Sequence, residues 1–444
     1  LELQIDSPKK QKLIPVLLSL VCECVFNVPS YCGFMLFPQI ECLYRDFSSQ
    51  GDDLNTVRQN LLINGQPIQN LQLQLTYFQL NQFYLRFIQN KTTPQRIFNS
   101  FTFSQQLQVA DQEPRVYETD LMLYLSVICQ LHPGLEFLRP TPDFQIAYSE
   151  TVVARVMLEA DQSQKGCLFF SQFLKSQLVK QTFQLQRVPD LTKMLKYFSY
   201  EHFYVIYCQF WQLDQDHDQF ITQEDLLQYG AVTCPYNFTC QCDQEKCICQ
   251  RIYNPLVVKR IFEQIPRRIH SETQMNYKDF VFFILCEENK DTPQAIDYFF
   301  QLLDVDGDGY IDYNDMQFFW PEMSRMLKAH HRECSPSKFD DLVCQLIDMA
   351  NFTTGAVGIN GGYQKINKLQ IKRSKMCGNF FNVFVNCQRF IQFDIKDPYS
   401  IKYQIGIEKT TWDRFARMMY DLMEDGETVE AQEAGELDGD VLVD

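Results

Sequence analysis

The sequence lacks the motifs with which the common enzyme classes build an active site. It has no P-loop, GxSxG elbow, kinase signature or HExxH pair, and it contains only six histidines in 444 residues. The clustered His and Asp motifs of a two-metal phosphatase are missing as well. His202 lies in the aromatic stretch YFSYEHFYVIY, where a core histidine is expected more often than a catalytic one. We therefore predict that the chain is not an enzyme.

Positive charge is also scarce. Lys and Arg number 40 against 56 Asp and Glu, which gives a formal net charge of -16. Without a basic stripe the chain is a poor candidate for nucleic-acid binding, which depends on Lys and Arg that neutralise phosphates. Ten acidic residues and no Lys or Arg follow Arg417. We expect this acidic tail, residues 421–444, to be solvated and mobile.

Long hydrophobic runs are absent too. The stretch LIPVLLSLVCECVF (13–26) follows Lys9, Lys10 and Lys12 and in this respect resembles a signal peptide or a short anchor. Glu23 interrupts it, and it is shorter than the roughly 18 apolar residues of a membrane span. A buried amphipathic helix is the favoured interpretation, and we predict no membrane span.

The 17 cysteines show no regular disulfide framework. Their number is odd and they are scattered through apolar stretches such as VIYCQF, as expected for reduced thiols packed as small apolar residues. An intracellular compartment, the cytoplasm, fits this pattern best. One cluster, CPYNFTCQCDQEKCIC at 234–249, admits a zinc site. Its Cys-x-Cys pairs lack the usual ligand spacing of roughly two to four residues, so an insertion loop with reduced thiols is favoured.

What the sequence does contain is the pattern of a mainly α-helical protein. Residues 1–130 show helical periodicity in pieces. From about residue 150, a helix, a polar or Gly-bearing turn, a short apolar segment and a second helix recur near 161, 214, 270, 304 and 355. This recurrence predicts tandem EF-hands. An isolated hand leaves apolar helix faces exposed, so we expect the hands to pack in pairs and metal-poor loops to persist as partners.

The repeat predicts four regions along the chain. The first is a divergent N-terminal helical region, 1–130. Two EF-hand modules follow, one over 131–290 with hands near 161, at 214–225 and near 270, and one over 291–395 with a hand at 304–315 and a degenerate partner near 355. The last region, 396–444, is a C-terminal helix with the acidic tail.

The stretch DVDGDGYIDYND, residues 304–315, has the pattern of a calcium loop. Calcium takes about six to eight oxygen ligands, which an EF-hand loop supplies from positions 1, 3, 5, 7, 9 and 12. Here these are Asp304, Asp306, Asp308, the Tyr310 carbonyl, Asp312 and Asp315. Gly309 permits the sharp turn, and Ile311 is placed for a short β contact with a neighbouring loop. Asp315 stands where Glu is usual, and its shorter side chain is expected to weaken affinity or selectivity over magnesium.

The stretch DQDHDQFITQED, residues 214–225, is the second candidate loop for Ca2+. Its ligands are Asp214, Asp216, Asp218, the Phe220 carbonyl and Asp225, with Thr222 at position 9. Gln219 replaces the turn glycine and requires a less favourable backbone there. The alternative is a metal-poor hand.

Two further loops lack the carboxylates that calcium needs. In DQSQKGCLFFSQ, near 161, Gly166 and Leu168 are kept, but Lys165 and Gln172 stand at ligand positions. The stretch RRIHSETQMNYKD, near 270, also offers too few carboxylates. We predict that both are structural hands.

Taken with their flanks, these loops resemble one known family. The stretch YFSYEHFYVIYCQFWQLDQDHDQFITQEDL (197–226) is similar to a signature of the B″ family of protein phosphatase 2A regulatory subunits. The likeness continues through MNYKDFVFFILCEENKDTPQAIDYFFQLLDVDGDGYIDYNDMQFF (275–319), LVCQLIDM (342–349) and WDRFARMMYDLM (412–423). HPGLEFL (132–138) and FQIAYSETVVARVML (144–158) extend it upstream, so that it covers roughly 130–425.

The resemblance implies a non-catalytic regulatory subunit. Members of this family bind a HEAT-repeat scaffold subunit and a catalytic subunit, and they direct which phosphoproteins the phosphatase acts on and where. The family carries two calcium-binding hands, which correspond to the loops at 214–225 and 304–315. The alternative is a structural or calcium-buffering EF-hand protein built into another assembly without a phosphatase.

Overall fold

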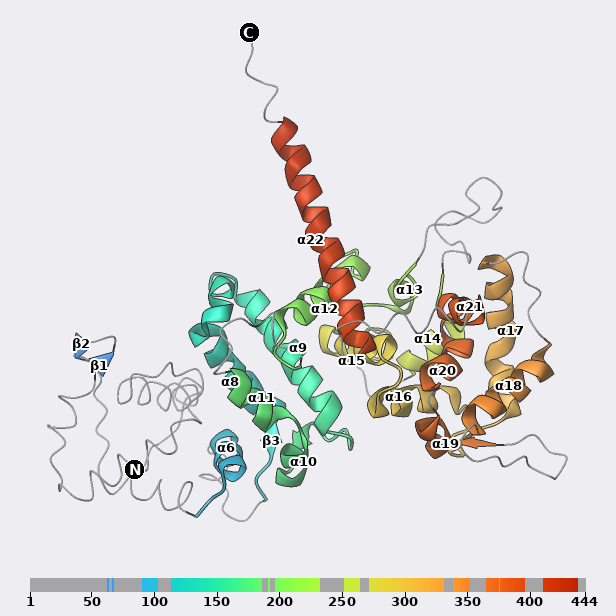
Figure 1. Cartoon of the computed structure of the whole chain (residues 1–444), viewed down its shortest axis with the longest axis horizontal. Coiled ribbons are helices and arrows are strands. Elements are labelled where there is room, and N and C mark those ends of the chain that lie inside the picture. The colour runs from blue at the N-terminus through green and yellow to red at the C-terminus, as the bar shows by residue number, and fades with distance from the viewer. Residues whose placement is uncertain are drawn as a thin grey trace, which may run out of the picture. The chain divides into compact units, whose positions relative to one another are not determined.

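The computed structural model describes residues 62–63, 66–67, 90–102, 113–185, 191, 196–231, 251–263, 271–330, 338–351, 365–374, 376–395 and 410–437. The apolar stretch 13–26 and the cysteine cluster 234–249 lie outside these ranges. The described chain is mainly helical, as predicted, with strands of two residues each (Figure 1). It divides into two compact units, Leu1–Phe203 and Tyr204–Asp444, and the boundary falls within one helix, α12. The domain boundaries expected from the sequence remain a prediction.

The first unit contains helices and two short antiparallel strand pairs, β1–β2 and β3–β4. In chain order these elements are β1 (Leu62–Ile63), β2 (Gln66–Pro67), α6 (Thr93–Phe101), β3 (Val116–Tyr117), α8 (Glu118–Leu131), the 3-10 helix η3 (Pro133–Leu138), α9 (Pro142–Ala160), β4 (Cys167–Leu168), α10 (Phe170–Lys175) and α11 (Leu178–Leu185). Helix α12 (Tyr200–Leu213) begins in this unit and ends in the next.

The described part of the second unit is mainly helical and has one short antiparallel strand pair, β5–β6. Its elements are α13 (Gln223–Leu226), α14 (Pro255–Phe262), α15 (Tyr277–Glu288), α16 (Pro293–Leu303), β5 (Tyr310–Ile311), α17 (Tyr313–His330), α18 (Phe339–Asn351), β6 (Ile366–Asn367), α19 (Lys368–Arg373), α20 (Cys377–Val385), α21 (Cys387–Ile395) and α22 (Thr411–Leu437).

Short antiparallel contacts between loops join the helix–loop–helix units in pairs, as predicted. The first pair joins the α6–α8 and α9–α10 hands through β3 and β4, the second joins the α12–α13 and α14–α15 hands, and the third joins the α16–α17 and α18–α19 hands through β5 and β6. The opposed apolar residues are Val116 and Leu168, Ile221 and Met275, and Ile311 and Ile366, all 0% exposed. Metal-poor hands therefore persist because their partners need an apolar surface against which to pack.

The α6–α8 hand of the first pair is one that the ligand pattern does not predict. It is the partner of the hand near 161, through Val116 and Leu168. Its exit helix α8 begins with a capping box in which Asp120 accepts a hydrogen bond from the Tyr117 backbone N–H at 2.9 Å. The same bond, from loop position 9 to the side chain at position 12, occurs in all three pairs. Capping chemistry at the exit helix is thus kept where metal ligands are not.

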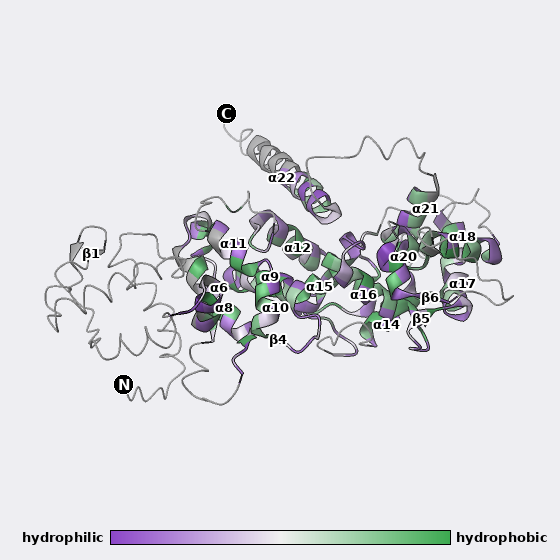
Figure 2. Ribbon diagram, turned by 60° about the horizontal axis from the view of Figure 1, so that its bottom comes forward, coloured by the Kyte–Doolittle hydropathy of each residue, from purple (hydrophilic) through white to green (hydrophobic). Residues whose placement is uncertain are grey.

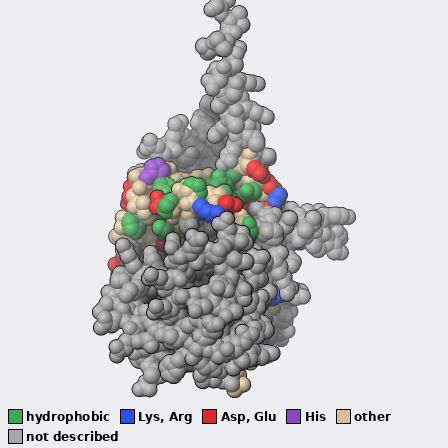
Figure 3. Space-filling model, turned by 90° about the vertical axis from the view of Figure 1, so that its left-hand side faces the viewer, with side chains coloured by type: hydrophobic (Ala, Val, Ile, Leu, Met, Phe, Trp, Pro, Cys, Tyr) green, Lys and Arg blue, Asp and Glu red, His purple; other side chains and the backbone are tan. Residues whose placement is uncertain are grey.

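Buried aromatic rings fill the core of the second unit. Phe280 and Phe283 of α15 pack edge-on or tilted against Tyr229 and Tyr253, and Phe299 of α16 lies 5.7 Å from the ring of Phe381. In Figure 2, hydrophobic and hydrophilic positions alternate along the helices of both units. On the described part of the face in Figure 3, apolar, acidic and basic side chains are interspersed.

The acidic C-terminal segment is helical further than its charge suggests. Helix α22 runs from Thr411 to Leu437 and so extends into the acidic segment that begins at residue 421. Glu, Ala, Met and Leu are frequent in this stretch, and all four are good helix formers. That the acidic tail is solvated and mobile stays a prediction. Among the helices that the structure describes, none combines the length and the apolar character that crossing a bilayer requires.

His202 is a core residue, as the aromatic context of its helix predicts. It is 1% exposed, and its Nδ1 lies 2.8 Å from the guanidinium of Arg155, which donates to it. Burial, and then the positive charge of Arg155, hold the pKa of His202 well below its usual value near 6.5. The imidazole is therefore neutral in the folded protein at physiological pH.

Acid should destabilise the first unit through this residue. Below about pH 6.5 the unfolded chain binds a proton at His202 that the folded chain does not, so stability falls as the pH is lowered. The expected loss is up to about 1.4 kcal/mol for each pH unit. Urea unfolding between pH 7.5 and 5 measures it. A His202→Gln variant should show a shallower slope over the same range, and equal slopes would contradict the assignment.

Candidate metal centres

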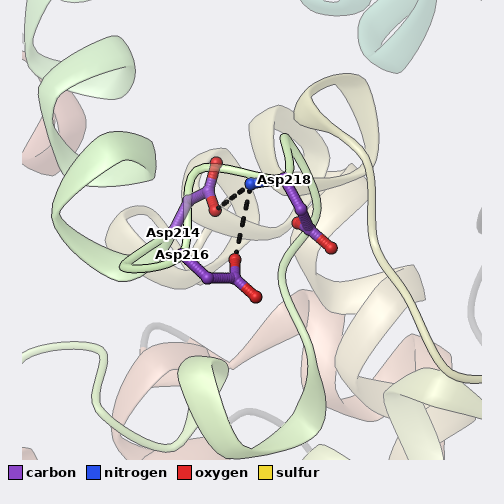
Figure 4. A group of neighbouring side chains, drawn as sticks. All are labelled: Asp214, Asp216 and Asp218. Carbon is purple, nitrogen blue, oxygen red and sulfur yellow. Dashed lines mark hydrogen bonds between the residues drawn. The ribbon is translucent and has the colours of Figure 1, made fainter.

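The loop between α12 and α13 brings three predicted ligands together. One carboxylate oxygen each of Asp214, Asp216 and Asp218 lies within 4.8 Å of the others (Figure 4). Oxygens that share one calcium at about 2.3–2.6 Å can be no more than about 5 Å apart, so this cluster fits a single ion. Asp214 is buried and shapes the loop, because it accepts the backbone N–H of Asp218 at 3.2 Å and of Gln219 at 3.0 Å. Asp216 and Asp218 are exposed.

The remaining predicted ligands of this loop lie at its end. Asp225 accepts hydrogen bonds from the Thr222 N–H at 2.9 Å and from the Thr222 hydroxyl at 2.7 Å, and it is not among the three gathered carboxylates. The Phe220 N–H donates to Asp218 at 2.8 Å. At position 12, therefore, Asp225 caps the start of α13.

The two candidate loops differ in backbone strain. In the 304–315 loop the residues at positions 4 and 6 are Gly307 and Gly309, with φ of 73° and 85°. In the 214–225 loop the same positions hold His217 and Gln219, with φ of 59° and 69°. A side chain in this left-handed region costs about 1 kcal/mol, so the expectation of an unfavourable backbone at Gln219 is confirmed.

The 304–315 loop gathers a different set of ligands. Oxygens of Asp304, Asp306 and Asp315 lie within 4.8 Å of one another, which again fits one calcium ion. Asp304 accepts the N–H groups of Gly307 at 2.8 Å and Gly309 at 3.0 Å. Asp315, despite its short side chain, belongs to the cluster, and its two oxygens accept the N–H groups of Val305 and Asp312, each at 2.9 Å.

Asp308 is not part of this gathered set. Its carboxylate forms an ion pair with Lys365, which precedes β6 on the partner hand, and the same ammonium lies 3.6 Å from Asp312. Tyr310, whose carbonyl is the predicted ligand at position 7, pairs with Asn367 in the β5–β6 contact. The ligand pattern does not predict Lys365, although its place one residue before the apolar bridge position could have indicated it.

Arg260 supports the start of the same loop from the neighbouring hand pair. Its guanidinium donates to the carbonyl oxygens of Leu302 at 2.6 Å and Asp304 at 2.8 Å. These carbonyls end α16 and have no partner within the helix. The charge of Arg260 also stabilises the negative end of the helix dipole. The sequence offers no local sign of this contact, because 42 residues separate Arg260 from Leu302.

One aspartate shapes a loop that lacks the other ligands. In the 161 loop, Asp161 accepts the N–H of Gly166 at 2.7 Å and the hydroxyl of Ser163 at 2.9 Å. Lys165 lies 5.8 Å from the centre of the Phe169 ring. The aspartate at position 1 therefore has the same backbone partner, the N–H at position 6, in the 161, 214 and 304 loops.

Electrostatics in the two candidate loops favour a bound cation. Burial raises the pKa of Asp214 and of Asp315, while the hydrogen bond from Lys365 lowers the pKa of Asp308. Crowded carboxylates repel one another, and a divalent cation removes that repulsion. Because the ligands must be ionised, protons compete with the metal at Asp214 and Asp315 as the pH falls. The oxygen-only donor set suits a hard cation such as calcium.

Two family models match the chain. An EF-hand domain model matches residues 100–187, and a model of an EF-hand domain pair matches residues 203–320. The first match includes the hand around Val116, and the second includes both candidate calcium loops.

Proteins of similar sequence carry the names of phosphatase regulatory subunits. The chain is 37% identical over 72% of its length to an Arabidopsis thaliana protein named as a probable B″ epsilon regulatory subunit of serine/threonine protein phosphatase 2A. It is 32% identical over 71% of its length to the human alpha form of the B″ regulatory subunits of the same phosphatase. The chain spans 56% of the length of the first protein and 25% of the second. Neither is named as a catalytic subunit, in agreement with the prediction that this chain is not an enzyme.

A solved structure is similar as well. It is described as a PP2A PR70 holoenzyme in a di-calcium form, and one of its chains is 30% identical to this one, with a TM-score of 0.53. The similarity covers 65% of this chain and 97% of that chain.

Proposed function

Because this chain belongs to the B″ family of protein phosphatase 2A regulatory subunits, we propose that it is a non-catalytic, calcium-binding subunit of a Ser/Thr phosphatase of the 2A type. In this role it binds the HEAT-repeat scaffold subunit and the catalytic subunit, and it directs the choice of phosphoprotein substrates or the location of the holoenzyme. The observation that carries the proposal is the likeness to the PR70 holoenzyme chain, which extends over 97% of that chain.

The proposal includes two calcium sites. The 304–315 loop would hold the ion with Asp304, Asp306, Asp308, Asp312, Asp315 and the Tyr310 carbonyl, and the 214–225 loop with Asp214, Asp216, Asp218, Asp225 and the Phe220 carbonyl. The gathered carboxylates in each loop support this assignment. A bound ion neutralises the cluster and fixes the helices on either side of it.

We also propose that the protein works in the cytoplasm. The seven cysteines in the described ranges are free thiols, and five of them are buried. Burial raises the pKa of Cys129 and of Cys377 to about 11, so these thiols are protonated and unreactive at neutral pH. Such side chains suit a reducing compartment.

A pull-down tests the central claim. The tagged full chain, expressed at native level, should recover both the scaffold and the catalytic subunit, and phosphatase activity should appear only in the recovered complex. The purified chain alone should give no phosphatase activity, because its sequence lacks the clustered His and Asp motifs of a two-metal phosphatase. Parallel purifications in calcium and in a chelator separate assembly from its calcium dependence.

Failure to recover either subunit would favour the alternative, a structural or buffering EF-hand protein in another assembly. An untagged lysate and a tagged unrelated EF-hand protein serve as controls for non-specific recovery. Calcium binding with no phosphatase subunits would support that alternative directly.

A further inference from the structure

Lys365 places a positive charge directly on the ligands of the 304–315 loop. Its ammonium pairs with Asp308, lies 3.6 Å from Asp312 Oδ2 and sits 5.8 Å from the centre of the Tyr310 ring. These three residues occupy positions 5, 9 and 7 of the loop, in that order. The lysine is held there by the backbone, because the next residue, Ile366, is paired with Ile311 in the β5–β6 contact.

The second hand pair provides an internal comparison. Its bridge joins Ile221 to Met275, and the residue before Met275 is Gln274, which is neutral. In that loop the carboxylate at position 5, Asp218, is gathered with those at positions 1 and 3. In the 304–315 loop the carboxylate at position 5, Asp308, is paired with Lys365 and lies outside the gathered set.

Charge explains what the lysine does for the ion-free loop. The 304–315 loop carries five aspartates, and their repulsion destabilises the loop unless a cation lies nearby. Lys365 supplies that cation from within the chain. An incoming divalent ion must then compete with the ammonium for Asp308 and Asp312, and it also experiences repulsion from the ammonium once bound.

Resting on the calcium binding proposed above, we propose that Lys365 sets the affinity of the 304–315 site. It is a tethered counter-ion that stabilises the ion-free loop and weakens the binding of calcium. The lysine therefore shifts the calcium concentration at which this hand fills.

Calorimetric titration with CaCl2 tests the proposal on the full chain. The parent variant carries Asp216→Asn and Asp218→Asn, which remove two exposed ligands of the other loop and keep the loop-shaping Asp214. Adding Lys365→Gln, which copies the neutral Gln274, should tighten calcium binding by about fivefold, the upper range for an exposed ion pair. Lys365→Arg keeps the charge and should leave the affinity near that of the parent.

Lys368→Gln is the matched control. Lys368 is three residues further along the same hand and pairs with Asp297 at 3.1 Å, which is not a calcium ligand. This variant should bind calcium as the parent does. Melting adds an independent readout: Lys365→Gln should melt below the parent in a chelator, and the difference should shrink or reverse in saturating calcium.

The outcomes distinguish the two claims. Binding by the parent with no tightening in Lys365→Gln, or equal tightening in Lys368→Gln, would overturn the role of Lys365 and leave the calcium site standing. No binding in the parent or in any variant would overturn both.

Discussion

Replacing Glu287 by Gln is expected to lower the free energy of unfolding by about 3–5 kcal/mol, because it removes one charge of a buried ion pair. Glu287 and Lys290 have side-chain exposures of 0% and 2% and are paired with each other. Burial lowers the pKa of Lys290 to about 8, and the carboxylate of Glu287 acts against that fall. Without it, the lysine must either stay charged in the core or lose its proton, and both carry a cost.

The surroundings make this pair hard to replace. Asn386 donates to the Glu287 carboxylate at 3.2 Å, and Arg389 of α21 lies 3.8 Å from it while donating to the Glu287 carbonyl oxygen at 3.0 Å. Tyr229 and Arg389 both bind the neighbouring Glu288. The cluster therefore links α15 to α21 within the second unit.

Thermal melting measures the loss, which should appear as a fall of about 10 °C. Glu322→Gln is the control, since its pair with the exposed Arg325 should change stability by no more than about 0.5 kcal/mol. Replacing both partners, Glu287→Leu with Lys290→Met, should recover only part of the loss, because Arg389 keeps its pair with Glu288 but the Asn386 amide loses its acceptor. A Glu287→Gln variant that melts like the wild type would contradict the role assigned to the pair.

Calcium should produce the other large effect. An ion present at about 1,000 times its dissociation constant stabilises the folded chain by about 4 kcal/mol for each occupied site. The melting temperature should therefore rise in CaCl2 relative to a chelator. Asp306→Asn with Asp308→Asn should remove the part of this rise that comes from calcium in the 304–315 loop. Asp216→Asn with Asp218→Asn should remove the part that comes from calcium in the 214–225 loop. Each pair of substitutions involves exposed carboxylates, but Asp308→Asn also removes the ion pair with Lys365. The rise in melting temperature is therefore measured for each variant against the same variant in a chelator.

Magnesium separates general charge neutralisation from a calcium site. Because the smaller ion prefers octahedral geometry and keeps several waters, it should stabilise the wild type less than calcium does. At the 304–315 loop, Asp315 stands where Glu is usual. Its shorter side chain is expected to reduce the difference between the stabilisation by calcium and that by magnesium. An unchanged melting temperature together with no calorimetric heat at millimolar calcium would argue against both sites.

The sequence predicts the roles of residues within one loop, but it does not predict contacts from residues that are far away along the chain. Gly309 and Gln219 adopt the positive φ that loop position 6 requires, and Ile311 makes the β contact that its position predicts. Such features depend on spacing within twelve residues. Arg260 and Lys365 reach the same loop from other hands, and only the folded chain reveals that they do.

The hand around Val116 was hidden for a different reason. Its loop has Glu113 at position 5, but Val109 stands at position 1 and Pro114 at position 6, where a calcium loop has Asp and Gly. What it keeps is an apolar residue at position 8 and an acceptor, Asp120, at position 12. The first is required for pairing and the second for helix capping. Both features are common in unrelated sequences, so they do not identify an EF-hand. Degenerate hands are thus recognised by their partner more readily than by their loop.

Asp161 shows that an aspartate at position 1 does not by itself indicate a calcium loop. Like Asp214 and Asp304, it accepts the backbone N–H of the residue at position 6 of its own loop. Its loop nevertheless has Lys165 and Gln172 at ligand positions. In these three loops the aspartate at position 1 therefore closes the turn, with or without the other metal ligands. At positions 3 and 5 the 214 and 304 loops have aspartates, each of which accepts the N–H two residues further on. The 161 loop has Ser163 and Lys165 there. These two positions therefore distinguish a candidate calcium loop from a metal-poor one better than position 1 does.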